Sequence, residues 1–168
     1  MSAHVTVLDL SLAKQGDGFR LGADDYRCTT DPNVFKDLAW SLDLILSTVP
    51  ENIDLDTYIG LLALNGTFVN ISSSQQRPLS LSSVNLLTNR RSLAGTRSGG
   101  IAETQEMIDF CAEHGVMAQV EVIGADAIDE AYQRLLAGYV RFRFVIDVST
   151  MRDTKAAPPI AELKARLA

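Results

Sequence analysis

The sequence predicts an α/β domain with a doubly wound parallel sheet, and three observations support this prediction. Residues 42–49 form an apolar run that ends at Pro50, and residues 67–71 form a second run rich in β-branched side chains. Between them, residues 55–64 have a helical pattern, with Asp54 placed as its N-cap and Asn65-Gly66 expected to end it. A strand, a helix and a strand within about thirty residues make a βαβ crossover. Because both runs are almost continuously apolar, they are typical of parallel strands covered on both faces.

Length, composition and charge restrict the class of protein. The 168 residues, 46% of them hydrophobic, are enough for about one domain with a packed core. No apolar run approaches the roughly 20 residues that a membrane span needs, and the chain leads at once into a strand pattern, so we expect no membrane segment and no signal peptide. The net charge of −6 argues against a nucleic-acid partner. Cys28 and Cys111 are isolated, which favours a reducing, cytoplasmic location.

A short strand and a weak helix are expected ahead of the crossover. Residues 5–8 form the strand, and residues 11–21 can form the helix. Gly16 and Gly18 each cost about 1 kcal/mol relative to alanine inside a helix, so we expect it to be frayed or broken. Together with Gly22 they read G-x-G-x-x-x-G, a near miss to the dinucleotide-binding fingerprint. The fingerprint glycines lie in the turn directly after a strand, so we do not favour a phosphate loop here.

The remaining elements of the first two thirds are short. Residues 23–30 are typical of an edge strand, and residues 31–38 of a small helix. After the crossover, residues 72–78 form a polar loop, and residues 79–88 are apolar and open between helix and irregular structure. Residues 92–96 predict one more strand.

The last third alternates between helix and strand. Helices are expected at 103–114 and 127–137, and strands at 119–123 and 141–148. Gly115 serves as the C-cap of the first helix, and Asp126 caps the second. Arg and Phe alternate in the last strand, which predicts one exposed and one packed face.

Several motifs follow one another in a fixed order along the chain. They are Ala3-His4-Val5-Thr6-Val7-Leu8, Leu21-Gly22-Ala23-Asp24, residues 42–49, Asn52-Ile53-Asp54-Leu55-Asp56, Asn65-Gly66-Thr67, Arg91-Ser92-Leu93-Ala94-Gly95, residues 99–107, residues 110–116 and residues 140–147. In this order they resemble the C-terminal half of zinc-dependent medium-chain alcohol dehydrogenases, in particular the cinnamyl-alcohol-dehydrogenase-like branch. The resemblance covers about residues 3–149.

The resemblance implies how the chain is divided. Residues 1–115 are expected to be a truncated Rossmann NAD(P)-binding domain that lacks its first strand and glycine-rich turn. Residues 116–150 are expected to be a remnant of the GroES-like catalytic domain, and residues 151–168 a tail. In this family the zinc ligands and the proton-relay residues lie in the N-terminal domain. The resemblance therefore implies no catalytic residue and no metal ligand in this chain.

The residues alone also give little support to a metal site. A zinc site needs three or four converging ligands, and the soft candidates are His4, Cys28, Cys111 and His114. Cys111 and His114 are i, i+3 neighbours that could touch one ligand. We favour the interpretation that they belong to an ordinary helix packing face.

Asp9, Ser11 and Lys14 are the expected contacts to the adenine ribose of a nicotinamide cofactor. In the cinnamyl branch a serine usually stands at the first position, and the three residues hold the 2′-phosphate of NADP. Ser11 and Lys14 match this pattern, whereas Asp9 does not. A carboxylate here accepts hydrogen bonds from the ribose 2′-OH of NAD and repels a 2′-phosphate, but it could equally cap the next helix. Both NAD and NADP therefore stay open.

The resemblance implies further cofactor contacts through backbone at the ends of the central strands. They map to Thr48, Val49, Ile71, Ser72 and the run Thr96-Arg97-Ser98, of which Thr96 and Ser98 are the expected contacts. The family commonly has Asn-Ile where this chain has Arg97-Ser98, which puts that last contact in doubt.

The absent first strand has a consequence for assembly. In the usual strand order 3-2-1-4-5-6 it lies between the strands expected at 5–8 and 42–49. Its removal leaves two inner edges with unpaired backbone groups, each a template for association, unless the two strands pair directly. The resemblance also implies a homodimer through residues 79–96.

Two functions from different classes follow. The chain is either the nucleotide-binding part of an NAD(P)-dependent alcohol dehydrogenase, incomplete by itself, or a non-catalytic remnant or interaction module that keeps the scaffold. In the family the reaction is the oxidation of primary alcohols or the reduction of aldehydes.

Overall fold

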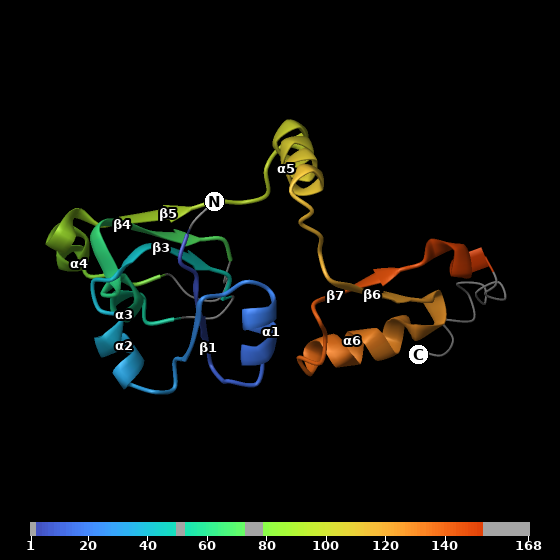
Figure 1. Cartoon of the computed structure of the whole chain (residues 1–168), viewed down its shortest axis with the longest axis horizontal. Coiled ribbons are helices and arrows are strands. Elements are labelled where there is room, and N and C mark those ends of the chain that lie inside the picture. Colours follow the sequence, from blue (N-terminus) through green and yellow to red (C-terminus); the bar gives the residue numbers. More distant parts are fainter. Residues whose placement is uncertain (1–2, 50–52, 73–78, 153–168) are drawn as a thin grey trace, which may run out of the picture. The chain divides into compact units, whose positions relative to one another are not determined.

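The chain forms two compact units, residues 1–98 and residues 99–168. Figure 1 shows the computed structural model, which describes residues 3–49, 53–72 and 79–152. Within these ranges no helix combines the length and the apolar character needed to cross a membrane.

Some sequence-based expectations concern residues outside these described ranges. These are the end of the apolar run at Pro50, the loop at 72–78 from residue 73 onward, and the tail at 151–168 from residue 153 onward. The expected domain limits at residues 115 and 150 concern the ancestry of the chain and stay a prediction.

The strands of the first unit are parallel and form two sheets. In chain order the elements are β1 (Thr6–Asp9), α1 (Gln15–Arg20), β2 (Asp25–Cys28), α2 (Asn33–Asp37), β3 (Leu42–Ser47), α3 (Leu55–Ile59), β4 (Leu62–Asn70), α4 (Ser83–Leu87), the 3-10 turn η1 (Thr88–Arg90) and β5 (Ser92–Gly95). Strand β1 pairs with β2, and β3, β4 and β5 pair in that order. The predicted α/β class with parallel sheets is confirmed.

The inner edges of β1 and β3 are not paired with each other. Among the described residues these strands belong to separate sheets, so the expectation of two open inner edges is confirmed and the alternative of direct pairing is wrong. Leu8 on β1 nevertheless packs against the core to which β3 contributes. Side chains, not backbone hydrogen bonds, therefore connect the two sheets.

The core of the first unit lies between α3 and the sheet of β3 and β4. Its buried members are Ile45, Leu55, Ile59, Leu61, Leu62 and Phe68. On the opposite side of β3, Leu44 is 56% exposed and Leu46 is 61% exposed. The expectation that both faces of this strand are covered is therefore wrong here: Ile45 meets the helix layer, while its two neighbours face outward.

The crossover differs from its prediction in where the helix ends. Helix α3 stops at Ile59, and β4 already begins at Leu62. Asn65-Gly66 lies inside β4, where the pairing with β3 shifts register and Asn65 has φ 63°. A Cβ on Gly66 would lie 2.9 Å from the Leu62 Cβ. The dipeptide therefore forms a strand bulge and does not end a helix.

The apolar segment at 79–88, left open by the sequence, forms a short helix that is tied to α3. The Asp56 carboxylate accepts hydrogen bonds from the Ser82 backbone N–H at 3.0 Å and from the Asn85 Nδ2 at 2.6 Å. Leu81 and Leu86 pack against the core. The segment thus covers the end of the sheet where β5 begins.

Arg91 is the buried cation of this region, at 6% exposed. Its Nε donates to the Leu62 carbonyl at 2.9 Å, and its two terminal nitrogens donate to the carbonyls of Asn85 and Gly60 at 3.4 and 3.3 Å. Three chain segments are therefore held by one guanidinium group.

Arg91→Ala is expected to lower the free energy of unfolding by about 3 kcal/mol, because one buried and two partly buried carbonyls lose their charged donor. Urea unfolding followed by circular dichroism measures the change. Arg90→Ala is the matched control, since Arg90 is exposed, and should cost little. Equal losses in the two variants would contradict the role given to Arg91.

The second unit packs one helix on a two-stranded parallel sheet and carries a second helix ahead of it. Its elements are α5 (Ile101–Glu113), β6 (Val120–Ile123), η2 (Ala125–Ala127), α6 (Ile128–Leu136), β7 (Arg143–Ile146) and η3 (Val148–Arg152). Arg134 of α6 binds the Glu121 carboxylate of β6 through two hydrogen bonds, at 2.6 and 2.8 Å. Its guanidinium also lies 4.9 Å from the ring centre of Phe144, so one side chain fastens α6 to both strands.

Two details of the second unit differ from the sequence-based expectation. Helix α5 begins at Ile101, two residues early, because the Glu103 carboxylate accepts the Gly100 N–H at 2.7 Å and completes its first turn. Asp126 lies in η2 and does not cap α6, whose N-cap is Ala127 without a side-chain cap. Gly115 follows α5 with φ 65°, as expected of a C-cap glycine.

Candidate cofactor-binding site

The carboxyl ends of β3, β4 and β5 lie side by side at one edge of their sheet. The Ile71 N–H donates to the Ser47 carbonyl at 3.0 Å, and the Thr96 N–H donates to the Asn70 carbonyl at 3.2 Å. Residues just beyond each strand, which include Thr48 and Ser72, therefore come together as the sequence predicted. In open α/β sheets, ligands bind outside this edge.

A wide, open cavity of about 580 Å³ lies at the same edge. It is lined by Ile71, Thr96, Arg97 and Ser98. The Thr96 hydroxyl donates to the Arg97 carbonyl at 3.2 Å, which fixes the turn after β5. The volume falls within the range of small-molecule sites, so three of the expected contact residues line one hollow; Val49 and Thr48 are not among its lining residues.

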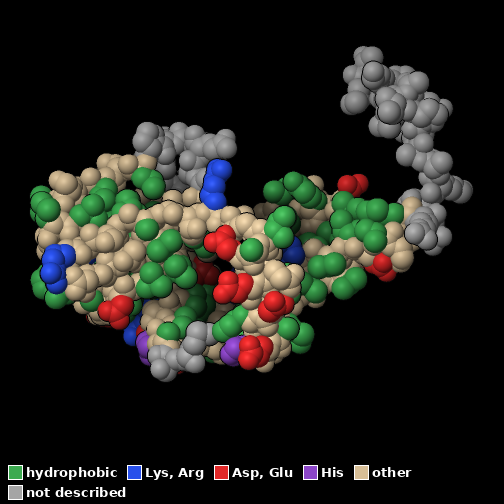
Figure 2. All heavy atoms as spheres, turned by 90° about the horizontal axis from the view of Figure 1, so that it is seen from above, with side chains coloured by type: hydrophobic (Ala, Val, Ile, Leu, Met, Phe, Trp, Pro, Cys, Tyr) green, Lys and Arg blue, Asp and Glu red, His purple; other side chains and the backbone are tan. Residues whose placement is uncertain are grey.

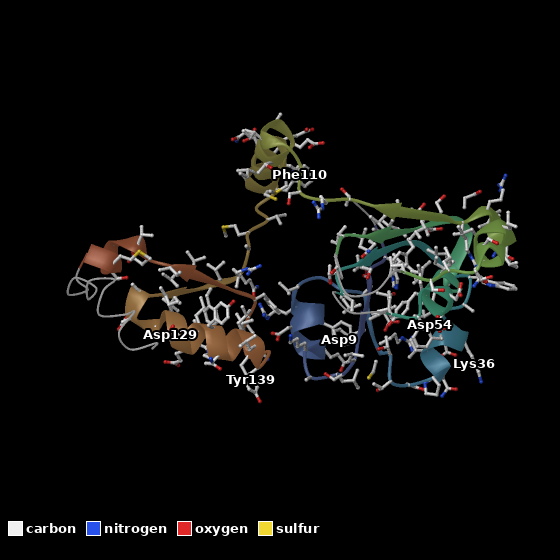
Figure 3. The ribbon with its side chains drawn as sticks, turned by 180° about the vertical axis from the view of Figure 1, so that it is seen from behind. Asp9, Lys36, Asp54, Phe110, Asp129 and Tyr139 are labelled. Atoms are coloured by element: carbon white, nitrogen blue, oxygen red, sulfur yellow. The ribbon has the colours of Figure 1, made fainter. Side chains whose placement is uncertain are left out.

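Asp9 ends β1 and is labelled in Figure 3. Both of its carboxylate oxygens have partners. Oδ2 accepts a hydrogen bond from the Tyr26 hydroxyl at 2.7 Å, and Oδ1 accepts the Leu10 N–H at 2.6 Å. Helix α1 begins later, at Gln15, with Lys14 as N-cap and no side-chain cap. The interpretation of Asp9 as a helix cap is therefore wrong, and its carboxylate is held at the strand end.

Ser11 and Lys14 occupy the turn between β1 and α1. The Ser11 hydroxyl accepts the Ala13 N–H at 3.3 Å, and the Lys14 carbonyl accepts the Gly18 N–H at 2.9 Å. The predicted helix at 11–21 is thus shortened. Its first four residues, which include Ser11 and Lys14, form a turn. The helix is not broken at its glycines, however, because Gly16 and Gly18 both lie inside α1; the shortening is at its amino end.

Tyr26 is the one residue of this site that sequence reasoning missed. It is 5% exposed, and burial, followed by the hydrogen bond to Asp9, raises the pKa of its hydroxyl to about 12. In the register of the parallel pair Tyr26 stands opposite Val7. Asp9 is two residues beyond Val7 on the same face, so the contact could have been found from alternation once the register was known.

Residues 1–113 match the sequence model of a family described as zinc-binding dehydrogenase. This match extends over most of the chain. The chain belongs to the zinc-binding dehydrogenase family. The resemblance inferred from the motifs is therefore confirmed.

Known zinc-binding dehydrogenases extend well beyond this chain. It is 52% identical over 153 residues to "NADP-dependent alcohol dehydrogenase C 1" of Mycolicibacterium smegmatis, covering 91% of this chain and 44% of that protein. It is 41% identical to "Probable cinnamyl alcohol dehydrogenase 6" of Arabidopsis thaliana, covering 90% and 42%. A solved cinnamyl alcohol dehydrogenase of Sorghum bicolor aligns with TM-score 0.82 and 35% identity, covering 92% and 43%. The chain thus spans less than half the length of these relatives.

The described residues of this chain do not offer a binding site for zinc, the metal after which the family is named. No group of three or more His, Cys, Asp or Glu side chains in residues 3–49, 53–72 and 79–152 is arranged to hold a metal ion. The Cys111 thiol instead contacts the Met107 sulfur at 3.7 Å, and the His114 ring stacks on Phe110 with centroids 4.0 Å apart. The first contact lies within α5, and the second joins its last turn to the C-cap residue His114. No residue of α5 is buried, so the expected packing face is not covered by another described element.

Proposed function

We propose that this chain is the nucleotide-binding part of an NAD(P)-dependent alcohol dehydrogenase and that other protein segments complete the enzyme. The observation that carries the proposal is the shared edge at which β3, β4 and β5 end beside an open cavity. The names of relatives such as "NADP-dependent alcohol dehydrogenase C 1" support it. Because the chain spans 44% of that relative, alcohol or aldehyde chemistry is proposed for the complete assembly.

We infer that different residues would contact the two ends of the cofactor. Asp9 would accept a hydrogen bond from the ribose 2′-OH, and Ser11 and Lys14 would meet a 2′-phosphate. Thr48, Val49, Ile71, Ser72, Thr96 and Ser98 would contact the remainder, mainly through backbone groups. The cofactor, when bound, supplies hydride exchange. This chain's own residues would bind and orient it.

The dinucleotide preference tests the role of Asp9. A carboxylate that meets the ribose favours a 2′-OH and repels a 2′-phosphate, so the unmodified chain should bind NADH about tenfold more tightly than NADPH, a difference of about 1.4 kcal/mol. Asp9→Ser should bring the two affinities close together. Calorimetric titration with each dinucleotide measures both effects.

Asp43→Ser is the matched control, because Asp43 is exposed at the amino end of β3, opposite the proposed site. It should leave the ratio unchanged. Tighter binding of NADPH by the unmodified chain would show that Asp9 does not meet the ribose.

A non-catalytic interaction module is the second candidate function. It is favoured by the open inner edges of β1 and β3 and by the exposed Leu44 and Leu46. The same titrations separate the candidates, because an interaction module that keeps only the scaffold should bind neither dinucleotide. We infer a cytoplasmic location from the free thiols of Cys28 and Cys111, which suit a reducing compartment.

A further inference from the structure

The Asp9 carboxylate is held by a donor on β2 and by a donor in the residue that follows β1. Tyr26 on β2 donates its hydroxyl to Oδ2 at 2.7 Å, and the Leu10 N–H donates to Oδ1 at 2.6 Å. The Asp9 carbonyl in turn accepts the Thr29 N–H at 2.8 Å. Because the backbone and both oxygens are fixed, the carboxylate has one orientation at the end of β1.

The position of Tyr26 depends on a glycine of α1. A Cβ on Gly18 would lie 2.7 Å from the Tyr26 Cδ2 and 3.0 Å from its Cε2, closer than side chains pack. The ring therefore fills the place that a side chain at Gly18 would take. Gly16, in the same helix, has no atom within 4 Å of such a Cβ. The glycine pattern that resembled a phosphate loop thus includes one glycine needed for packing and one that is not.

The hydrogen bond from Tyr26 leaves the Asp9 carboxylate with unused acceptor positions. A carboxylate has about four acceptor positions on its two oxygens, and the two contacts with Tyr26 and Leu10 use two of them. Asp9 itself is half-buried, so part of the residue stays open to solvent and to a ligand. The buried Tyr26 hydroxyl stays protonated at neutral pH and acts as a permanent donor.

We propose that Tyr26 is a positioning residue for dinucleotide specificity: its hydroxyl orients the Asp9 carboxylate so that a free oxygen lone pair meets the ribose 2′-OH. This inference rests on the proposed function. A 2′-OH can donate a hydrogen bond to the oriented oxygen, whereas a 2′-phosphate carries no such donor. The fixed orientation of the carboxylate therefore strengthens the binding of NADH and changes the binding of NADPH little.

Tyr26→Phe removes only the hydroxyl. In calorimetric titrations of the full chain it should weaken NADH binding about fivefold and leave NADPH binding within about twofold. Tyr58→Phe is the matched control, because the Tyr58 ring packs edge-on against Phe35 and has no part in the site. In an Asp9→Ser background, Tyr26→Phe should have no further effect on the NADH to NADPH ratio.

Gly18→Ala is a second variant that keeps the hydroxyl and displaces the ring. It should lower the NADH to NADPH preference as Tyr26→Phe does, while Gly16→Ala should leave it unchanged. A preference unchanged in both Tyr26→Phe and Gly18→Ala would overturn the positioning role alone. Failure of the unmodified chain to bind either dinucleotide would overturn the proposed function and this assignment with it.

Discussion

The isolated chain is expected to show no measurable alcohol dehydrogenase turnover. In this family a zinc ion polarises the alcohol oxygen, which contributes several kcal/mol of transition-state stabilisation, and each 1.36 kcal/mol is a factor of ten in rate. The described residues form no group that could hold the metal. They also include no glycine-rich turn followed by a helix of useful length at the end of β1, since α1 has six residues. We therefore expect no positioning of the cofactor pyrophosphate on a helix N-terminus at the end of β1.

The assay is aldehyde reduction followed by NADH and NADPH absorbance, with zinc added and with the metal content of the purified chain measured in parallel. The full-length alcohol dehydrogenase of Mycolicibacterium smegmatis, 52% identical over the shared region, is the positive control. Aldehyde reduction above background by this chain alone, or a zinc content near one per chain, would contradict the prediction.

The order of elements could be predicted from the sequence because hydrophobic patterns repeat with the period of each element. The limits of elements could not, where tertiary contacts override the local signal. Asn65-Gly66 is a strong turn signal, yet it lies in a bulge of β4 because Leu61 and Leu62 are buried in the core. Glu103 lengthens α5 through a contact with Gly100 that no hydrophobic pattern shows.

The residues of the candidate site, like the order of elements, could be predicted from the sequence, but their contacts could not. Asp9 follows one strand pattern, and Ile71 and Thr96 are the last residues of two others; parallel strands bring their carboxyl ends together. The partner of Asp9 depends on the register of β1 and β2, in which Tyr26 stands opposite Val7. Register is set by pairing and packing over the whole sheet, so a local pattern does not reveal that Tyr26 fixes the carboxylate.

After the lack of turnover, self-association of the isolated chain is the second large effect that we expect. Unpaired strand edges are templates for pairing with another chain, and β1 and β3 each present one. Leu44 and Leu46 expose apolar surface on β3 as well, and Figure 2 shows hydrophobic side chains at many places on the surface. Association through these edges has no geometric end point, so aggregates should grow with concentration.

A defined dimer is expected through a different surface, residues 79–96. Val84 is 62% exposed and Leu87 is 77% exposed in this segment, and Leu93 on the outer strand β5 is 38% exposed. Apolar side chains on adjacent α4 and β5 form a surface that a second copy of the chain could cover. We propose that the smallest stable species is a dimer formed there.

Light scattering over a concentration series should show the mass of a dimer at low concentration and larger species above it. Leu87→Glu should convert the dimer to a monomer, because a charge would be buried in the interface. Leu46→Lys should instead suppress the larger species, because a charge on an open edge opposes strand pairing. Leu12→Glu is the control, since Leu12 is an exposed residue of the turn before α1. A clean monomer of the unmodified chain at high concentration would contradict both surfaces, and a dimer that survives Leu87→Glu would contradict the assignment to residues 79–96.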